Sequence, residues 1–175
     1  KYRKKFQQYF QRDGKVVGFK YGGTSYQILI HEVKVYVQAY AAYCVLAARR
    51  HLTELPKVLV IDIGGFTVDY MILRYGRLEK EHVDSLESGV ICLYGRIRAA
   101  IRQKYSIALD EEDIDNIILG KNTGYMQELK ERVREVTIGY VTELLGTFRE
   151  LGIDFRTTQT VFMGGGAILV SEIIK

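Results

Sequence analysis

The chain has 175 residues, and 47% of them are hydrophobic, which is enough for one hydrophobic core or for two small lobes that share one. Its 25 basic and 21 acidic residues leave a net charge of +4, so the composition indicates neither a disordered chain nor a strongly basic nucleic-acid-binding domain. No apolar run approaches the ~20 residues that span a bilayer, and no signal peptide is recognisable, which favours a cytoplasmic protein that does not bind a membrane. Cys44 and Cys92 are far apart and have no histidine cluster beside them, so we expect reduced core residues.

The first third of the chain predicts a helix, a hairpin and a second helix. Spaced aromatic residues in 1–12 suit a short amphipathic helix. Residues 15–20 and 25–31 predict two strands around a Gly-Gly turn. Residues 35–51 are apolar nearly all the way round the helix they predict, so we expect that helix to be buried on most faces.

Three strands are predicted next along the chain. Residues 57–63 form a nearly continuous apolar run, which is typical of a central strand that is buried on both faces. Residues 67–74 and 77–83 predict the second and third strands, joined around Tyr75-Gly76.

Helices dominate the second half. Apolar residues recur at helical spacing from Val90 to Tyr105, and Ser85 or Ser88 is expected to cap that helix. Further helices are predicted at 110–119 and at 127–151.

A last strand is predicted at 160–163, and three glycines then lead into a helix at 167–174. Three strands, several helices, a strand and a helix together predict an α/β domain with one mixed sheet.

The segment from Asp62 to Asp69 has the pattern D-x-G-G-x-T-x-D between two apolar strands. The first strand delivers Asp62 to its C-terminal end, where a carboxylate can act on a ligand. The two glycines after it let backbone N–H groups approach a phosphate closely, and Thr67 can add a hydroxyl donor. An ordinary hairpin with surface aspartates is the alternative, but the complete pattern favours phosphate binding.

This stretch resembles the "phosphate 2" motif of the actin, Hsp70 and sugar-kinase superfamily. Residues 161–167, VFMGGGA, resemble its "adenosine" motif and follow at a distance of about a hundred residues, in the superfamily's order. The resemblance implies a ribonuclease-H-like mixed sheet flanked by helices, in the second lobe of an actin-like ATPase. It also implies ATP or GTP with Mg²⁺ as the cofactor.

The same resemblance assigns roles to individual residues. Asp62 would be catalytic and would hold Mg²⁺, through a water molecule. Gln38 lies where actin carries a glutamine that positions water, and it would orient the water that attacks the γ-phosphate, although a locally bonded helix-start residue is the alternative. The residues expected to contact the nucleotide are Gly64, Gly65, Phe66, Thr67, Asp69, Gly89, Gly164, Gly165, Gly166 and Ala167.

Within the superfamily the chain is most similar to the plasmid-segregation actin-like ATPases of the ParM/StbA type. The stretches HEVKVYVQAYAAYCVL, DSLESGVICLYGRI and DEEDIDNIILGK carry this similarity. It implies a cytoskeletal protein that assembles head to tail into filaments and reaches plasmid DNA only through an adaptor protein. The alternatives are a small-molecule kinase of the same superfamily and a slowly hydrolysing actin-like scaffold in cell division or pilus assembly.

No stretch resembles the superfamily's first phosphate loop. We therefore expect 1–34 to be the end of a first lobe or a lead-in hairpin, and 35–175 to be the second lobe of a longer protein. Because the nucleotide lies between two lobes in this superfamily, we expect weak or no nucleotide binding and no meaningful turnover by this chain alone, whereas the intact protein would be an ATPase or GTPase.

Overall fold

The computed structural model describes residues 3–36 and 38–174. Its contacts divide the chain into two compact units, Lys1–Ala41 and Ala42–Lys175. Each unit is described here by itself.

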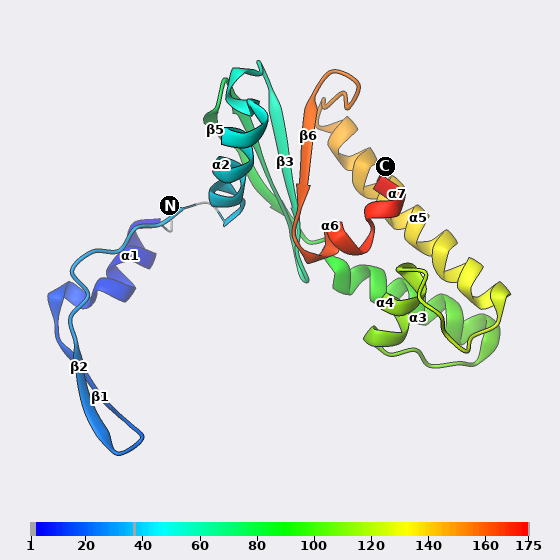
Figure 1. The fold of residues 1–175 in the computed structure, drawn as a ribbon, viewed down its shortest axis with the longest axis horizontal. Helices are drawn as coiled ribbons and strands as arrows, with labels where there is room; N and C mark the ends of the chain where they lie inside the picture. The colour runs from blue at the N-terminus through cyan, green and yellow to red at the C-terminus, as the bar shows by residue number, and fades with distance from the viewer. Residues whose placement is uncertain (1–2, 37, 175) are drawn as a thin grey trace. The chain divides into compact units, whose positions relative to one another are not determined.

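The first unit contains a helix and a hairpin (Figure 1). Its elements are α1 (Arg3–Gln11), a 3₁₀ turn (Arg12–Gly14), β1 (Val17–Tyr21) and β2 (Thr24–Ile28). The two strands pair antiparallel, from Val17 opposite Ile28 to Tyr21 opposite Thr24. Both turn glycines have a positive φ, which explains why glycine is needed there. The helix and hairpin expected from the sequence are confirmed.

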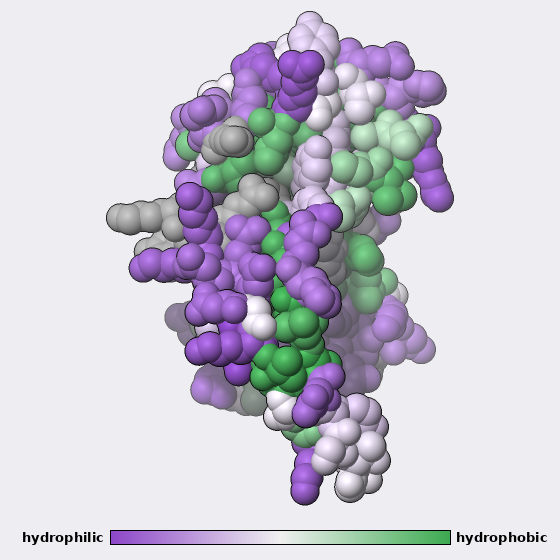
Figure 2. Space-filling view, turned by 90° about the vertical axis from the view of Figure 1, so that its left-hand side faces the viewer, coloured by the Kyte–Doolittle hydropathy of each residue, from purple (hydrophilic) through white to green (hydrophobic). Residues whose placement is uncertain are grey.

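The first unit has almost no apolar core. Of its described hydrophobic residues only Ala39 is buried, and Phe6, Phe19 and Tyr26 are among those that are exposed. Figure 2 shows apolar side chains (green) exposed at the surface between hydrophilic ones (purple). The Phe19 and Tyr26 rings stack across the hairpin at 5.3 Å, so this unit is held by local pairs rather than by a buried centre.

The second unit is built on a four-stranded mixed sheet. Its strands are β3 (Val58–Ile63), β4 (Val68–Arg74), β5 (Arg77–Leu86) and β6 (Gln159–Met163). The spatial order is β5-β4-β3-β6, in which β3, β4 and β5 form an antiparallel meander and β6 runs parallel to β3. The central strand β3 is buried at every position, as its continuous apolar run predicts. The predicted α/β fold class is confirmed.

Helices cover this sheet. They are α2 (Gln38–Arg50), α3 (Val90–Tyr105), α4 (Glu111–Ile118), α5 (Gln127–Glu150), α6 (Gly165–Leu169) and α7 (Ser171–Ile174). The long helix α5 lies along one side of the sheet and packs against α3 and α4, while α2 is drawn on the other side (Figure 1). None of the helices in the described ranges is long and apolar enough to cross a membrane.

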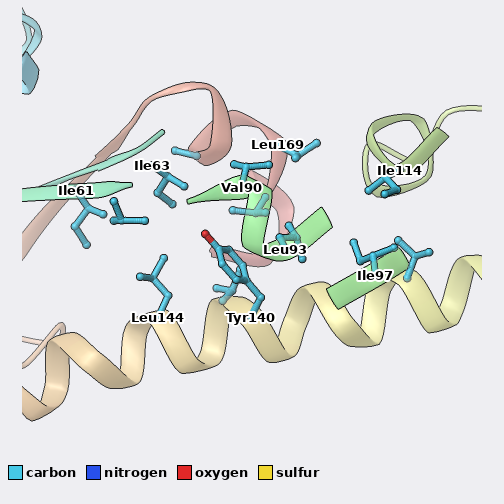
Figure 3. Packing of buried hydrophobic residues seen from close by; sticks show 14 of the residues in the cluster. Ile61, Ile63, Val90, Leu93, Ile97, Ile114, Tyr140, Leu144 and Leu169 are labelled. Atoms are coloured by element: carbon cyan, nitrogen blue, oxygen red, sulfur yellow. The ribbon is translucent and has the colours of Figure 1, made fainter. Parts of the chain in front are cut away.

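The main core lies between the sheet and α3, α4 and α5. Figure 3 shows Tyr140 of α5 pointing toward the sheet, near Leu144 of the same helix and Leu93 of α3. The Tyr140 hydroxyl donates to the Ser88 carbonyl oxygen at 2.6 Å, which satisfies its polar end. Ile61 and Ile63 supply the sheet side of this core. The buried residues of α5, from Leu129 to Phe148, therefore form one side of this core.

Four expectations from the sequence need correction. The helix α2 is buried only along one stripe, because Val45 is 58% exposed and Cys44, expected in a core, is exposed too. Neither expected serine caps α3: Ser85 lies in β5, and Gly89 is the N-cap residue. The single helix expected at the end of the chain is two short helices, since the chain leaves helical geometry at Val170.

Candidate functional site

Asp62 lies near the C-terminal end of β3, one residue before the strand ends. Its side chain is buried, and its cross-strand partner in the ladder is Asp69. Burial raises the pKa of the Asp62 carboxyl above its ordinary value, and the negative charge of Asp69 raises it further. Asp69 is held in turn, because the Ser85 hydroxyl donates to its Oδ1 at 2.5 Å. A cation or a hydrogen-bond donor would relieve the unfavourable charge on Asp62.

The turn after Asp62 leaves backbone donors available. The Gly64 N–H donates to the Thr67 carbonyl oxygen at 2.9 Å, which closes the turn between β3 and β4. Among the described residues, no hydrogen bond is recorded from the Gly65 and Phe66 N–H groups. Both residues are exposed, so these two N–H groups can reach a ligand phosphate.

The start of α3 is fastened to this turn. Val90 N–H donates to the Gly64 carbonyl oxygen at 3.0 Å, and Ile91 N–H donates to that of Gly65 at 2.9 Å. The Gly89 N–H donates to the Phe66 carbonyl oxygen at 3.1 Å. A Cβ on Gly89 would lie 2.5 Å from the Gly65 oxygen, which is far closer than ordinary contact. Gly89 therefore packs directly against the turn. Its expected contact with nucleotide stays a prediction.

The second glycine segment meets the same end of β3. Gly164 has φ +90°, and a Cβ there would collide with the Asp62 carboxylate and lie 2.6 Å from the Ile63 carbonyl oxygen. A Cβ on Gly166 would lie 2.5 Å from methyl carbons of both Ile63 and Val90. Only glycine fits at these two positions, so the segments that resemble the phosphate 2 and adenosine motifs are brought into direct contact.

One cavity of about 470 Å³ opens beside these glycines. Its wall is formed by the turn Gly64–Phe66, the first turn of α3, one side of α4 and the start of α6. This volume falls in the range of about 300–1,000 Å³ that is usual for small-molecule sites. Gly165 and Gly166 line the cavity, whereas Ala167 is buried behind it.

Polar side chains enter this cavity from α3 and α4. The Tyr94 hydroxyl of α3 donates to Asp115 Oδ1 of α4 at 2.6 Å. Burial, followed by this hydrogen bond, raises the pKa of the Tyr94 phenol, so the donor stays protonated. Motif analysis missed both residues because they are 21 positions apart and no short pattern joins them. Their helical register, which turns both toward the apolar stripe, was the available signal.

Gln38 is the first residue of α2 and belongs to the first unit. Asp62 belongs to the second unit, so the water-orienting role of Gln38 stays a prediction.

The site fits a magnesium ion that is bound mainly by ligand oxygens and water. Across residues 3–36 and 38–174, no three His, Cys, Asp or Glu side chains come together as a metal site. Mg²⁺ in nucleotide sites usually keeps several waters and takes one or two carboxylates besides phosphate oxygens. A single buried carboxylate such as Asp62 fits that donor set, and its contact with Mg²⁺ through water stays a prediction.

Comparison with known proteins decides the family. The family model described as archaeal actin homologue MreB-like, C-terminal, matches residues 60–175. The chain belongs to this family of archaeal actin homologues. No curated protein shows a significant sequence match to it.

Several solved structures share the actin-homologue fold with this chain. The archaeal actin homologue Ta0583 in complex with ADP has a TM-score of 0.67 at 19% identity, over 91% of this chain and 54% of that one. The Alp12 filament structure has a TM-score of 0.67 at 17% identity, over 99% and 55%. A non-polymerisable mutant of pCBH ParM has a TM-score of 0.65 at 19% identity, over 88% and 50%. This actin homologue thus spans about half the length of the structures it matches.

Proposed function

We propose that this chain forms one wall of the nucleotide site of a filament-forming, actin-like ATPase or GTPase of the ParM/StbA plasmid-segregation type. The observation that carries the proposal is the meeting of two glycine segments, about a hundred residues apart, around the buried carboxylate of Asp62. Both segments line one cavity of suitable size. Residues 35–175 would be the second lobe, and 1–34 would belong to the first lobe.

Each part of the wall has a distinct task in this proposal. The N–H groups of Gly65 and Phe66, with the Thr67 hydroxyl, bind the β- and γ-phosphates. Asp62 holds the water shell of Mg²⁺, and Gln38 orients the attacking water. Gly164, Gly165 and Gly166 support the nucleoside; Gly164 and Gly166 do so by packing directly against Asp62, Ile63 and Val90, where a side chain does not fit.

The wider biology follows from the similar structures. Ta0583 was solved with ADP, Alp12 was solved as a filament, and the pCBH ParM variant was made non-polymerisable. We carry nucleotide binding and self-association over to the present protein on that basis. The ParM-like stretches of the sequence support plasmid segregation, with DNA reached through an adaptor.

Nucleotide titration of the ¹⁵N-labelled chain tests the site. With millimolar ADP and Mg²⁺, we expect amide shifts at residues 64–67 and 164–167, while the amide of Gly139, exposed in the middle of α5, serves as the control. Binding that spares both glycine segments would refute the proposal. Light scattering of the full-length gene product with nucleotide then tests filament formation. Substrate-dependent release of ADP without polymer would instead indicate a small-molecule kinase.

A further inference from the structure

The cavity beside the glycine segments has an acidic end. Its α4 side contributes Glu111 and Asp115, and no lysine or arginine is among the described residues that line it. The rest of its wall is largely apolar, including Ile63, Val90 and Leu169. Phosphate groups would be repelled from this end, so it suits the part of a nucleotide that donates hydrogen bonds.

The two carboxylates differ in how they are paired. Glu111 Oε1 lies 3.5 Å from Nη2 of Arg98, which offsets its charge. Asp115 has no ion pair among the described residues, and the only hydrogen bond described for its side chain is the one that Oδ1 accepts from Tyr94. Its other oxygen, Oδ2, is therefore an acceptor at the wall of an apolar cavity. Such a group favours a ligand that brings donors to it.

The nucleobases differ in what they can offer to a carboxylate. The Watson–Crick edge of guanine carries two adjacent donors, N1–H and the 2-amino group. Adenine carries one amino donor beside N1, which is an acceptor and is repelled by a carboxylate oxygen. A site built around a fixed acceptor rejects the analogue that lacks the matching donor more strongly than it rejects a change in apolar shape.

We propose that Asp115 is a specificity-determining residue that makes this site prefer guanine nucleotides to adenine nucleotides. The inference rests on the proposed function, because it assumes that a nucleotide occupies this cavity. Tyr94 is a positioning residue in this arrangement, since its hydroxyl holds one oxygen of Asp115, and no partner is described for the other.

Equilibrium binding of GDP, IDP and ADP to the full-length gene product, by calorimetry with Mg²⁺, tests the proposal. IDP keeps N1–H but lacks the 2-amino group. We expect GDP to bind about tenfold more tightly than ADP, because guanine can donate a hydrogen bond to the charged carboxylate that adenine cannot match. The affinity of IDP should lie between those of GDP and ADP. Asp115→Asn should reverse the order toward ADP, since an amide both accepts from and donates to adenine.

Glu112→Gln is the matched control. It makes the same charge change one turn earlier in α4, on an exposed side chain outside the cavity, and should keep the wild-type order. Equal or tighter binding of ADP by the wild type, or an unchanged GDP-to-ADP ratio in Asp115→Asn, would overturn the base preference and leave the proposed function standing. Failure of all three nucleotides to bind would overturn both. The comparison of GDP with IDP needs only the wild-type full-length protein, so it decides independently of how well the variant folds.

Discussion

Substitution of Gly89 by alanine tests whether the phosphate-type turn and α3 form one rigid piece. The backbone of Gly89 has φ −67° and ψ 177°, a conformation open to any residue, so alanine meets no torsional strain there. The obstacle is space: the new Cβ would lie 2.5 Å from the Gly65 oxygen and 2.6 Å from its carbonyl carbon. Both are backbone atoms, which cannot turn aside as a side chain can.

The expected cost follows from what must move. Relieving the overlap separates α3 from the turn and strains the hydrogen bonds that Gly89, Val90 and Ile91 donate to it. Overpacking costs about 1–3 kcal/mol and each lost hydrogen bond about 0.5–1.5 kcal/mol, so we expect a loss of about 2–4 kcal/mol of unfolding free energy. Gly95 lies inside the same helix with open space around it, so Gly95→Ala should stabilise by about 0.5–1 kcal/mol.

Urea unfolding followed by circular dichroism measures both variants, with amide spectra to locate the change. Gly89→Ala should also shift the amide signals of residues 64–67, whereas Gly95→Ala should leave them in place. The reasoning is refuted if Gly89→Ala stays within about 0.5 kcal/mol of the wild type, or if both variants lose stability equally.

Three further substitutions test the remaining assignments. Asp62→Asn should raise the melting temperature at pH 7, because the raised pKa of Asp62 means that its carboxylate form disfavours folding. The gain should shrink as the pH falls and Asp62 itself becomes protonated. A gain that is constant with pH would contradict this. Tyr140→Phe should cost about 1 kcal/mol at neutral pH through the lost hydrogen bond to Ser88. Burial raises the pKa of Tyr140 to about 12, so the wild type should lose stability between about pH 10 and 12 in denaturation curves, and the variant should lose less. In the full-length protein, Gln38→Ala should slow hydrolysis in a phosphate-release assay but spare nucleotide binding; equal loss of both would rule out its water-orienting role.

The strands were the most predictable part of the fold. The continuous apolar run of β3 and the Gly-Gly turn after it are local signals, and they fixed the position of Asp62 on the sheet. The sequence also predicted the length of α5, since its apolar residues recur over 24 positions at one spacing. Fold class and motif positions thus followed from periodicity and turn chemistry alone.

Other features could not be predicted because they depend on neighbours distant in the chain. The motif around Gly89 predicts that it contacts nucleotide. Only the turn that packs against Gly89 shows why a Cβ does not fit there. The apolar residues of α2 predict a helix that is buried on most faces. Its exposure is set by which elements cover it, and Cys44 is exposed as a result. The pairing of Tyr94 with Asp115 likewise needs the packing of α3 beside α4.

The hydrogen bonds between the turn and α3 have a mechanical consequence. The carbonyl oxygens of Gly64, Gly65 and Phe66 accept hydrogen bonds from the N–H groups at the start of α3. The turn therefore cannot shift unless the helix moves with it along its axis. With 16 residues at 1.5 Å each, α3 is about 24 Å long and ends at Tyr105, whose hydroxyl donates to the Glu128 carbonyl oxygen at the start of α5. Hydrogen bonds thus join the turn to one end of α3 and the other end of α3 to the start of α5, so we expect a displacement of the turn to be passed along α3 toward α5.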